Sequence, residues 1–393
     1  MPTHPMREVG RRIAATRQAR RMKQADLARA AFVSLATIKA IERGARLPSD
    51  DTLDSIAAAL NVDPSRLATG STHTETRIHA ALTAISAVIA GYDLPGDPPR
   101  QPLEELTQAV GVLVDWRLGA QYARTAKHAP DLLADTLAAL HHTVGRDRLR
   151  AARLVAATAR AADAVAYKCG QRDLSARLVD LIRWAAPRTG DPLVEATAAY
   201  VRTETFFAAR AHAQGLQALE QAIDASPRPT GPDTAAARGA LHMRAAVIAG
   251  RAGAPDAATT HLAEARRLGD AVREDVYDGT AFGPDSVRAH EVSVAVSLGR
   301  DHLRRALDVA AEWTPPSTLP AERQSGFWIE LSRAQLWAGR PDDAFESLKT
   351  ARLVAPQHTR EHPWARETAA TLRRLKRADA ESLTRFAEWI GAV

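Results

Sequence analysis

The chain has 393 residues, of which 46% are hydrophobic and 25% charged, and its formal net charge is +6. This length exceeds one ordinary domain core, so we expect two or three domains. The single cysteine, Cys169, excludes an internal disulfide framework and suits a reducing cytoplasm. No apolar run approaches the ~20 residues that span a bilayer, and the N-terminus has no apolar leader. We therefore expect a cytoplasmic protein that does not enter a membrane.

The positive charge is concentrated at the N-terminus. Residues 1–47 hold eleven Lys and Arg but three Asp and Glu, a net charge of +8, whereas residues 48–70 carry −3 and the remainder +1. Such a field on a small unit indicates a polyanionic partner for that unit alone. A solvated basic face would give the same charge signal.

Apolar residues recur at three- and four-residue spacing almost everywhere, and no convincing run of strand residues occurs, so we predict an all-α protein. The N-terminal unit divides into five helices, with a turn at Phe32–Val33 and Ser49 or Asp50 as the cap of the fourth. The predicted ranges are 9–21, 24–31, 34–43, 50–61 and 63–68. The predicted shared core consists of Ile13, Leu27, Ala28, Ile38, Ile41, Leu53, Ile56 and Leu60.

The stretch "KQADLARAAFVSLATIKAIERGARLPSDDTLDSIAAALNV" closely resembles the helix-turn-helix domain of the Xre (phage-repressor) family. The resemblance covers roughly residues 7–68. It implies that Gln24 holds a DNA phosphate and that Arg17 pairs with Glu42. It also implies that the first residues of the third helix face the bases.

In this docking mode the recognition helix meets base edges with its N-terminal residues. The base-facing candidates are Ser34, Leu35, Ala36, Thr37, Lys39 and Ala40. Leu35 and Ala36 can contact only a thymine methyl, so specificity should depend more on DNA shape and on two half-sites read together. The phosphate-contacting candidates are Arg17, Gln24, Arg43 and Arg46.

Two stretches interrupt the helical pattern after the N-terminal unit. Residues 68–76 are small and polar, and residues 91–102 contain four prolines. We predict a DNA-binding domain at 1–70, a linker with a connecting helix at 71–101, and a helical repeat domain at 102–393.

The larger part contains a tetratricopeptide-like pattern. The pattern consists of Trp328, Leu331, Gly339, Ala344, Leu348, Ala351 and Pro356. The 17-residue spacing from Gly339 to Pro356 recurs from Gly170 and from Gly299, while Gly253 keeps only the alanines. The spacing predicts an α-solenoid of helix pairs with a concave surface. The whole chain resembles actinobacterial Xre-type regulators with such an array.

We expect a ligand pocket on the concave side, lined by helices around residues 200–300. The segment Thr280–Val287 breaks the repeat, and a loop at Phe282–Val287 is placed at the pocket rim. The candidate ligand-binding residues are Phe282, Asp285, Arg288 and His290. The alternative interpretation of this segment is a plain connector between mismatched repeats.

No motif indicates catalysis, a metal or another cofactor. The stretch "HTREH" (His358–His362) matches a zinc-peptidase signature, but Pro356 and Pro363 flank it, so we predict a loop between repeats. The seven tryptophans are expected in the core, with Trp364 and Trp389 as an alternative dimer seam.

We therefore predict a non-enzymatic, sequence-specific transcription regulator that binds a double-stranded DNA operator as a homodimer. Its array would sense a small molecule, a peptide or a protein partner. The alternative is an antitoxin-like or adaptor module whose main target is another protein.

Overall fold

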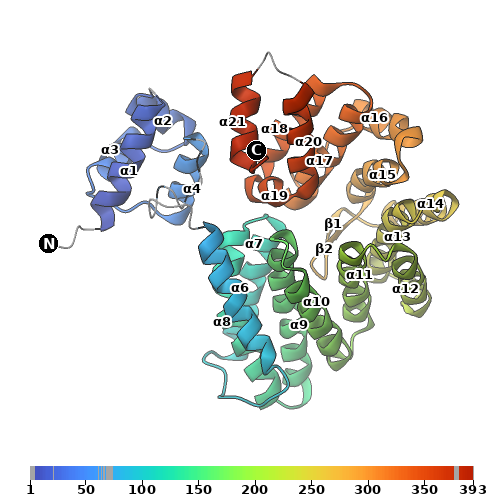
Figure 1. Cartoon of the computed structure of the whole chain (residues 1–393). Helices are drawn as coiled ribbons and strands as arrows, with labels where there is room; N and C mark the ends of the chain where they lie inside the picture. The colour runs from blue at the N-terminus through green and yellow to red at the C-terminus, as the bar shows by residue number, and fades with distance from the viewer. Residues whose placement is uncertain are drawn as a thin grey trace. The chain divides into compact units, whose positions relative to one another are not determined.

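The computed structural model describes residues 5–20, 22–60, 62, 64, 67, 74–375 and 380–392. The chain divides into two units, Met1–Ala81 and Leu82–Val393 (Figure 1). None of the described helices is long and apolar enough to cross a membrane.

The first unit contains four described helices: α1 (Pro5–Ala19), α2 (Gln24–Ala30), α3 (Leu35–Glu42) and α4 (Asp50–Ala59). Two serines begin helices as N-caps, because each hydroxyl accepts a backbone N–H that has no partner within the helix. Ser34 Oγ accepts from Thr37 N at 3.1 Å, and Ser49 Oγ accepts from Thr52 N at 3.3 Å. The predicted fifth helix, at residues 63–68, falls largely outside the described residues.

The core of the first unit joins all four helices. Its fully buried side chains include Ile13, Leu27, Ile38, Ile41, Ile56 and Leu60. The predicted core is thereby confirmed, except that Leu53 is only half-buried. Gly10 allows α1 to cross α3 closely, since a Cβ there would lie 2.1 Å from the carbonyl oxygen of Ile41.

The second unit is a succession of helix pairs (Figure 1). Helix α6 (Thr74–Ala90) contains the boundary between the units. It is followed by α7 (Leu103–Leu118), α8 (Tyr122–His142), α9 (Gly145–Lys168), α10 (Arg172–Ala185), the 3-10 turn η1 (Ala186–Thr189), α11 (Pro192–Ala209), α12 (His212–Ala225), α13 (Pro232–Arg251) and α14 (Pro255–Gly269). After a β-hairpin come α15 (Pro284–Leu298), the 3-10 turn η2 (Arg300–His302), α16 (Leu303–Glu312), α17 (Ala321–Trp337), α18 (Pro341–Val354), α19 (Pro356–Glu361), α20 (Pro363–Leu375) and α21 (Ala380–Ile390).

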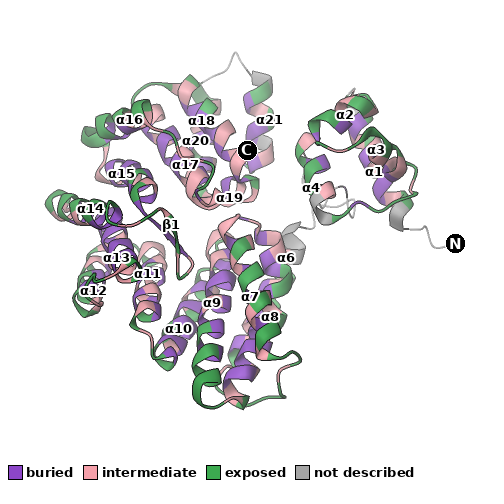
Figure 2. Ribbon diagram, turned by 180° about the vertical axis from the view of Figure 1, so that it is seen from behind, coloured by how far each residue is buried: buried purple, intermediate pink, exposed green. Residues whose placement is uncertain are grey.

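The first helix of most pairs ends at a residue in the left-handed region. The φ angles are 55° at Ala120, 75° at Gly170, 54° at Arg210, 74° at Gly253 and 75° at Gly339. This conformation closes the C-terminus of a helix and reverses the chain. The buried residues then lie where successive helices meet (Figure 2), as the helical spacing predicts.

The array of the second unit returns to its own beginning, because α17 and α19 contact α8 and α9. Lys168 Nζ lies 3.0 Å from Glu322 Oε1 and donates to His358 Nε2 at 3.0 Å. The backbone N–H of Ala123 donates to Gln357 Oε1 at 2.8 Å.

A two-stranded β-hairpin precedes α15, where no run of strand residues was expected, although the prediction of an all-α fold is confirmed. Strand β1 (Asp275–Tyr277) pairs antiparallel with β2 (Thr280–Phe282), with Tyr277 opposite Thr280. The turn residues Asp278 and Gly279 have φ angles of 43° and 72°, as a two-residue hairpin turn requires. The predicted loop at Phe282–Val287 is wrong, because α15 begins at Pro284.

Candidate DNA interface and inner cavity

The N-terminal half of α3 presents its side chains to solvent. Ser34, Leu35, Ala36 and Lys39 are exposed, and Thr37 is half-buried. The Ser34 and Thr37 hydroxyls lie 2.8 Å apart and share a hydrogen bond, so they form one polar unit at the start of the helix. The structure thus brings the base-facing candidates together on one short surface, with Ala40 half-buried.

A network around Glu42 connects α1, α2 and α3. Arg17 donates from Nε to Glu42 Oε1 at 2.7 Å and from Nη2 to Glu42 Oε2 at 2.9 Å. Gln24 Nε2 also donates to Glu42 Oε2, at 2.7 Å. The hydrogen bond to Glu42 raises the pKa of Arg17, so this guanidinium stays charged. The ion pair implied by the family resemblance is present, and Gln24 adds a hydrogen bond to its carboxylate.

The structure separates the four phosphate candidates into two kinds. Arg43 and Arg46 are exposed, and Arg43 Nε donates to the carbonyl oxygen of Lys39 at 3.2 Å. Gln24 is half-buried at the start of α2. Arg17 is 8% exposed and also donates from Nη1 to the carbonyl of Met22, so its position is that of a structural residue.

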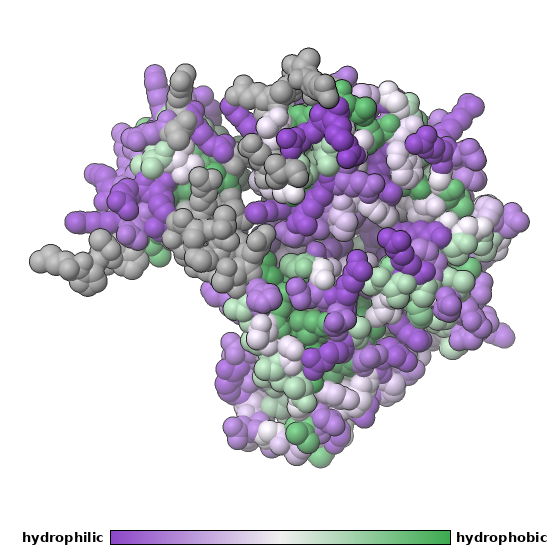
Figure 3. Space-filling view, viewed as in Figure 1, coloured by the Kyte–Doolittle hydropathy of each residue, from purple (hydrophilic) through white to green (hydrophobic). Residues whose placement is uncertain are grey.

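Phe32, in the turn between α2 and α3, was not among the sequence candidates. Its side chain is 97% exposed and its φ is 54°, in the region that favours glycine. An aromatic residue within a helix-turn-helix turn is the signal that could have identified it. It adds an exposed apolar side chain to the turn that precedes α3. The visible face of the unit is otherwise largely hydrophilic (Figure 3).

The second unit holds an inner cavity of about 240 Å³. The first helices of six successive pairs line it, together with the β-hairpin, α19 and Trp364 of α20. The lining therefore extends from Arg117 to Trp364, well beyond the predicted region of residues 200–300.

Of the four predicted ligand-binding residues, only His290 lines this cavity. Phe282 is fully buried against Gly239, where an added Cβ would lie 2.0 Å from its ring. Asp285 accepts a hydrogen bond from Trp313 Nε1 at 3.1 Å, and Arg288 is exposed. Phe282 and Asp285 are therefore placed as packing and anchoring residues.

The "HTREH" stretch forms α19 and its end, so the prediction of a loop between repeats is wrong, while Pro363 does begin the next helix. His358 accepts from Lys168, so its Nδ1 donates to Ser325 Oγ at 2.6 Å. Burial, with Lys168 adding to it, lowers the pKa of His358 to about 3. Within the described ranges, no three His, Cys, Asp or Glu side chains are grouped so that they could hold a metal ion.

A helix-turn-helix family model matches residues 13–67. The first unit is therefore a helix-turn-helix domain, as its α2–turn–α3 geometry also indicates. A comparison with curated proteins returned no match.

Two solved structures resemble the chain at low similarity. One is PlcR of Bacillus thuringiensis in complex with the peptide PapR7 and DNA, with 13% identity, 67% of this chain and 95% of that chain covered, and a TM-score of 0.29. The other is the apo form of the competence regulator ComR of Streptococcus vestibularis, with 13% identity, 95% and 99% covered, and a TM-score of 0.34. At these values no residue's role is transferred from either protein.

Proposed function

We propose that the chain is a sequence-specific DNA-binding transcription regulator. The observation that carries this proposal is the helix-turn-helix unit, in which α3 begins with an exposed set of base-facing candidates and is followed by the exposed cations Arg43 and Arg46. Cations at this place suit phosphate contacts, which fix the register of the helix, while Ser34, Thr37 and Lys39 can hydrogen-bond to base edges.

We further infer that residues 102–393 form a tetratricopeptide-type sensor array that also mediates homodimerisation, with residues 1–70 as the DNA-binding domain and 71–101 as the connection. Two observations support a sensor. DNA binding by one helix-turn-helix unit does not require an array of this length, and the array contains a polar cavity. The effector would be a small molecule, a peptide or a protein partner.

Footprinting of the full-length protein on the DNA upstream of its own gene tests the proposal. We expect two protected half-sites about 34 Å apart, or a multiple of this, because a dimer of such units contacts successive turns of the major groove. Thr37→Ala should relax the base preference, whereas Arg273→Gln, on the second unit, should not. Absence of any protection at low salt would show that the chain is not a DNA-binding regulator.

A further inference from the structure

The inner cavity of the second unit is lined by an unusual number of charged side chains. Among the residues that the structure describes, six cations and four carboxylates line it. The cations are Arg117, Arg160, Lys168, Arg244, Arg251 and Arg323, and the carboxylates are Asp163, Glu204, Glu322 and Glu330. They come from five helices that are far apart in sequence, so the concentration of charge is a property of the folded array.

Among the described residues, most of these cations make no ion pair with a carboxylate. Lys168 pairs with Glu322 at 3.0 Å, and Arg244 lies 3.8 Å from Glu204. Within the described part of the chain, the other four guanidinium groups make no ion pair with a carboxylate; they belong to Arg117, Arg160, Arg251 and Arg323.

These four groups contact neutral partners instead. Arg117 donates to the carbonyl of Gly279, and Arg160 donates to the carbonyl of Asp278 at 2.8 Å. Arg323 donates to His290 Nε2 at 2.8 Å. Arg251 lies over the rings of Phe207 and Trp364, at 4.3 and 4.5 Å from their centroids. Neutral groups therefore make the close contacts with these four guanidinium groups, while Glu204, Glu322 and Glu330 act on Arg117, Arg160 and Arg251 only from beyond ion-pair distance.

Two of the lining arginines also retain an unused donor. The Nε atoms of Arg117 and Arg244 are buried and have no hydrogen-bond partner, and Arg117 as a whole is 7% exposed. A buried donor without a partner has lost its hydrogen bond to water, which destabilises the folded chain. Such a cost is recovered when a ligand with acceptor atoms enters.

The carboxylates compensate less than their number suggests. Burial, and after it the neighbouring Glu204, raise the pKa of Asp163 well above its usual value, which disfavours its charged form. Burial raises the pKa of Glu330 to about 7. The cavity is thus more positive at neutral pH than a count of its side chains indicates.

Two further groups report the same positive field. Burial, followed by the adjacent Arg117 and with a smaller contribution from Arg244, lowers the pKa of Arg160 to about 9. Burial alone would raise the pKa of Tyr200, but Arg244, Arg323 and Arg160 outweigh it and lower that pKa to about 8. Clustered cations thus disfavour another cation and favour an anion.

We propose that this cavity binds a compact organic anion that carries carboxylate or phosphate groups, held by the guanidinium groups of Arg117, Arg160, Arg244, Arg251 and Arg323. This inference rests on the proposed function, since it names the class of effector that the array senses. Planar guanidinium groups bind carboxylate and phosphate through paired hydrogen bonds and remain charged when buried.

The cavity also limits the size and shape of the ligand. Its volume of about 240 Å³ lies below the ~300–1,000 Å³ of sites for drug-sized molecules. The rings of Tyr200, Phe207 and Trp364 supply an apolar wall for the organic part. A small metabolite with one to three acidic groups fits this description.

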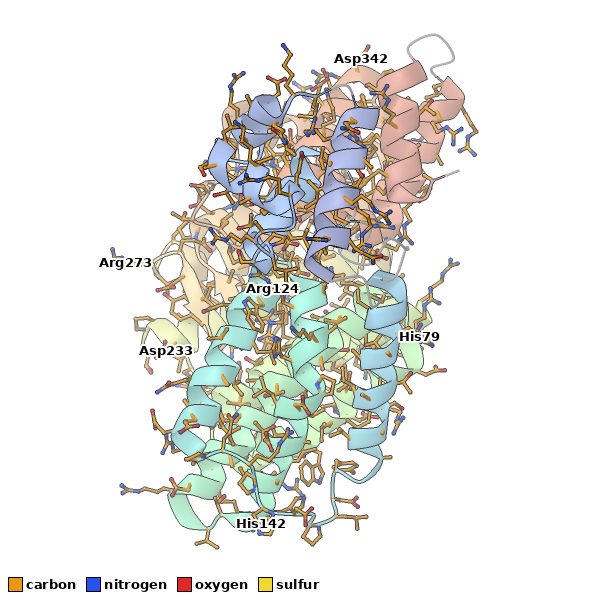
Figure 4. All side chains as sticks on the ribbon, turned by 90° about the vertical axis from the view of Figure 1, so that its left-hand side faces the viewer. His79, Arg124, His142, Asp233, Arg273 and Asp342 are labelled. Atoms are coloured by element: carbon orange, nitrogen blue, oxygen red, sulfur yellow. The ribbon has the colours of Figure 1, made fainter. Side chains whose placement is uncertain are left out.

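Thermal unfolding and calorimetric titration of the full-length protein test the proposal with two probes, inorganic phosphate and citrate, against sodium chloride at equal ionic strength. A saturable probe at ten times its Kd should raise the Tm by about 2–4 °C. R251Q should raise the Kd for the probe about tenfold or more, since Arg251 contacts only rings and its loss leaves the backbone contacts intact. The matched control is R273Q, because Arg273 is exposed and extends away from the ribbon (Figure 4).

A second variant changes the affinity in the opposite direction. E204Q removes a negative charge from the lining while keeping its shape, so it should lower the Kd for both probes several-fold. The pair keeps the test informative if R251Q does not fold. Inorganic phosphate represents ligands with phosphate groups, and citrate represents ligands with carboxylates. The ratio of their Kd values shows which of the two groups the site prefers.

Three outcomes would overturn the proposal. They are no saturable effect beyond that of sodium chloride, equal weakening by R251Q and R273Q, and binding of a peptide while neither probe binds. Footprinting tests the proposed DNA-binding function independently of the cavity. An anion that binds without changing DNA affinity supports the cavity proposal and contradicts the sensor function. DNA protection without anion binding supports DNA binding by the chain and contradicts the cavity proposal.

Discussion

Glu42 holds the DNA-binding unit together through side chains from three helices. Its carboxylate accepts from Arg17 of α1 and from Gln24 of α2 while it lies at the end of α3. The pairing with Arg17 follows from the family resemblance, but the bond to Gln24 could not be read from spacing. It depends on how α2 packs across α3, and that angle is set by buried side chains such as Leu27 and Ile38.

Removal of the Glu42 carboxylate tests this role. Glu42→Ala should lower the free energy of unfolding of the first unit by about 2–3 kcal/mol, between an exposed and a fully buried pair. The reason is that the Arg17 and Glu42 side chains are only 10% and 5% exposed, so the arginine is left as an uncompensated charge. The measurement is denaturant unfolding of the full-length protein.

The matched control is Glu8→Ala, which removes a partly exposed partner of Arg12 in the same unit. We expect a loss below about 1 kcal/mol there. Equal losses in the two variants would mean that Glu42 is an ordinary surface group. Gln24 should also lose its fixed orientation in Glu42→Ala, so DNA affinity should fall with the stability.

His358 should make the second unit sensitive to acid. Its pKa is about 3 in the folded chain and about 6.5 when unfolded, so the unfolded chain binds the proton first as the pH falls. The stability it contributes is complete above pH ~6.5 and is lost toward pH 3. Between pH 6.5 and 5 the loss should be about 1.5–2 kcal/mol.

The measurement for His358 is the free energy of unfolding at the two pH values. In His358→Asn, which can still donate to Ser325, the decrease on acidification should be smaller than in the wild type by that amount. The same decrease in both proteins would show that His358 is protonated without cost, which its contact with Lys168 argues against.

At the scale of elements, glycine spacing in the sequence predicts some of the turns between paired helices and misses others. The spacing identified Gly170, Gly253, Gly299 and Gly339. Three of them have a left-handed backbone near φ 75° where a first helix ends, whereas Gly299, at the end of α15, has φ 100° and ψ −168°. The spacing missed the equivalent turns at Ala120 and Arg210, because nothing in those residue types marks a positive φ. Packing of the flanking helices holds these two residues in a conformation that costs roughly 1–2 kcal/mol each.

The β-hairpin was missed for a different reason. Each strand has three residues, too few to show an alternating pattern, and Asp278–Gly279 was the one local signal. The hairpin is fixed from outside by Phe282 against α13 and by Arg117 and Arg160 on its turn. The two arginine contacts connect residues more than a hundred positions apart, so they leave no local pattern.

Two glycine-to-alanine substitutions in helices should have opposite effects. At Gly239 of α13 an added Cβ would lie 2.0 Å from the Phe282 ring, so Gly239→Ala should lower the stability of the second unit by about 1–3 kcal/mol. At Gly111 of α7 no atom outside its own helix lies within 4 Å, so Gly111→Ala should raise it by about 0.5–1 kcal/mol.

The measurement is the Tm of each glycine-to-alanine variant, compared with that of the unchanged protein. If Gly239→Ala is neutral or stabilising, the hairpin does not depend on the close approach of Phe282 to α13. A destabilising Gly111→Ala would mean that the exposed face of α7 is covered by a partner.

At the scale of the whole molecule, the helix-turn-helix unit and the charged cavity differ in how far the sequence predicts them. The helix-turn-helix unit could be predicted from local sequence, because caps, turn and core positions lie within about sixty residues of one another. The closure of the array and its charged cavity could not. Lys168 meets His358 across 190 positions, and the cavity arginines lie on separate helix pairs with no shared motif.

The charge of the first unit leads to the last prediction, which concerns DNA affinity and salt. Arg46 is exposed near the C-terminal end of α3, on the unit that holds most of the chain's positive charge. If it neutralises a phosphate, its loss removes one released counterion per half-site, so the slope of log affinity against log salt becomes shallower by about 0.9 per half-site. Arg46→Gln should therefore weaken binding to the operator and to unrelated DNA by similar factors at low salt. Arg304→Gln is the matched control, since Arg304 is an exposed arginine of the second unit whose side chain is 92% exposed. Gel-shift titrations at four or more salt concentrations give the slopes. An unchanged slope in Arg46→Gln, or an equal change in Arg304→Gln, would place the phosphate contacts elsewhere than after α3.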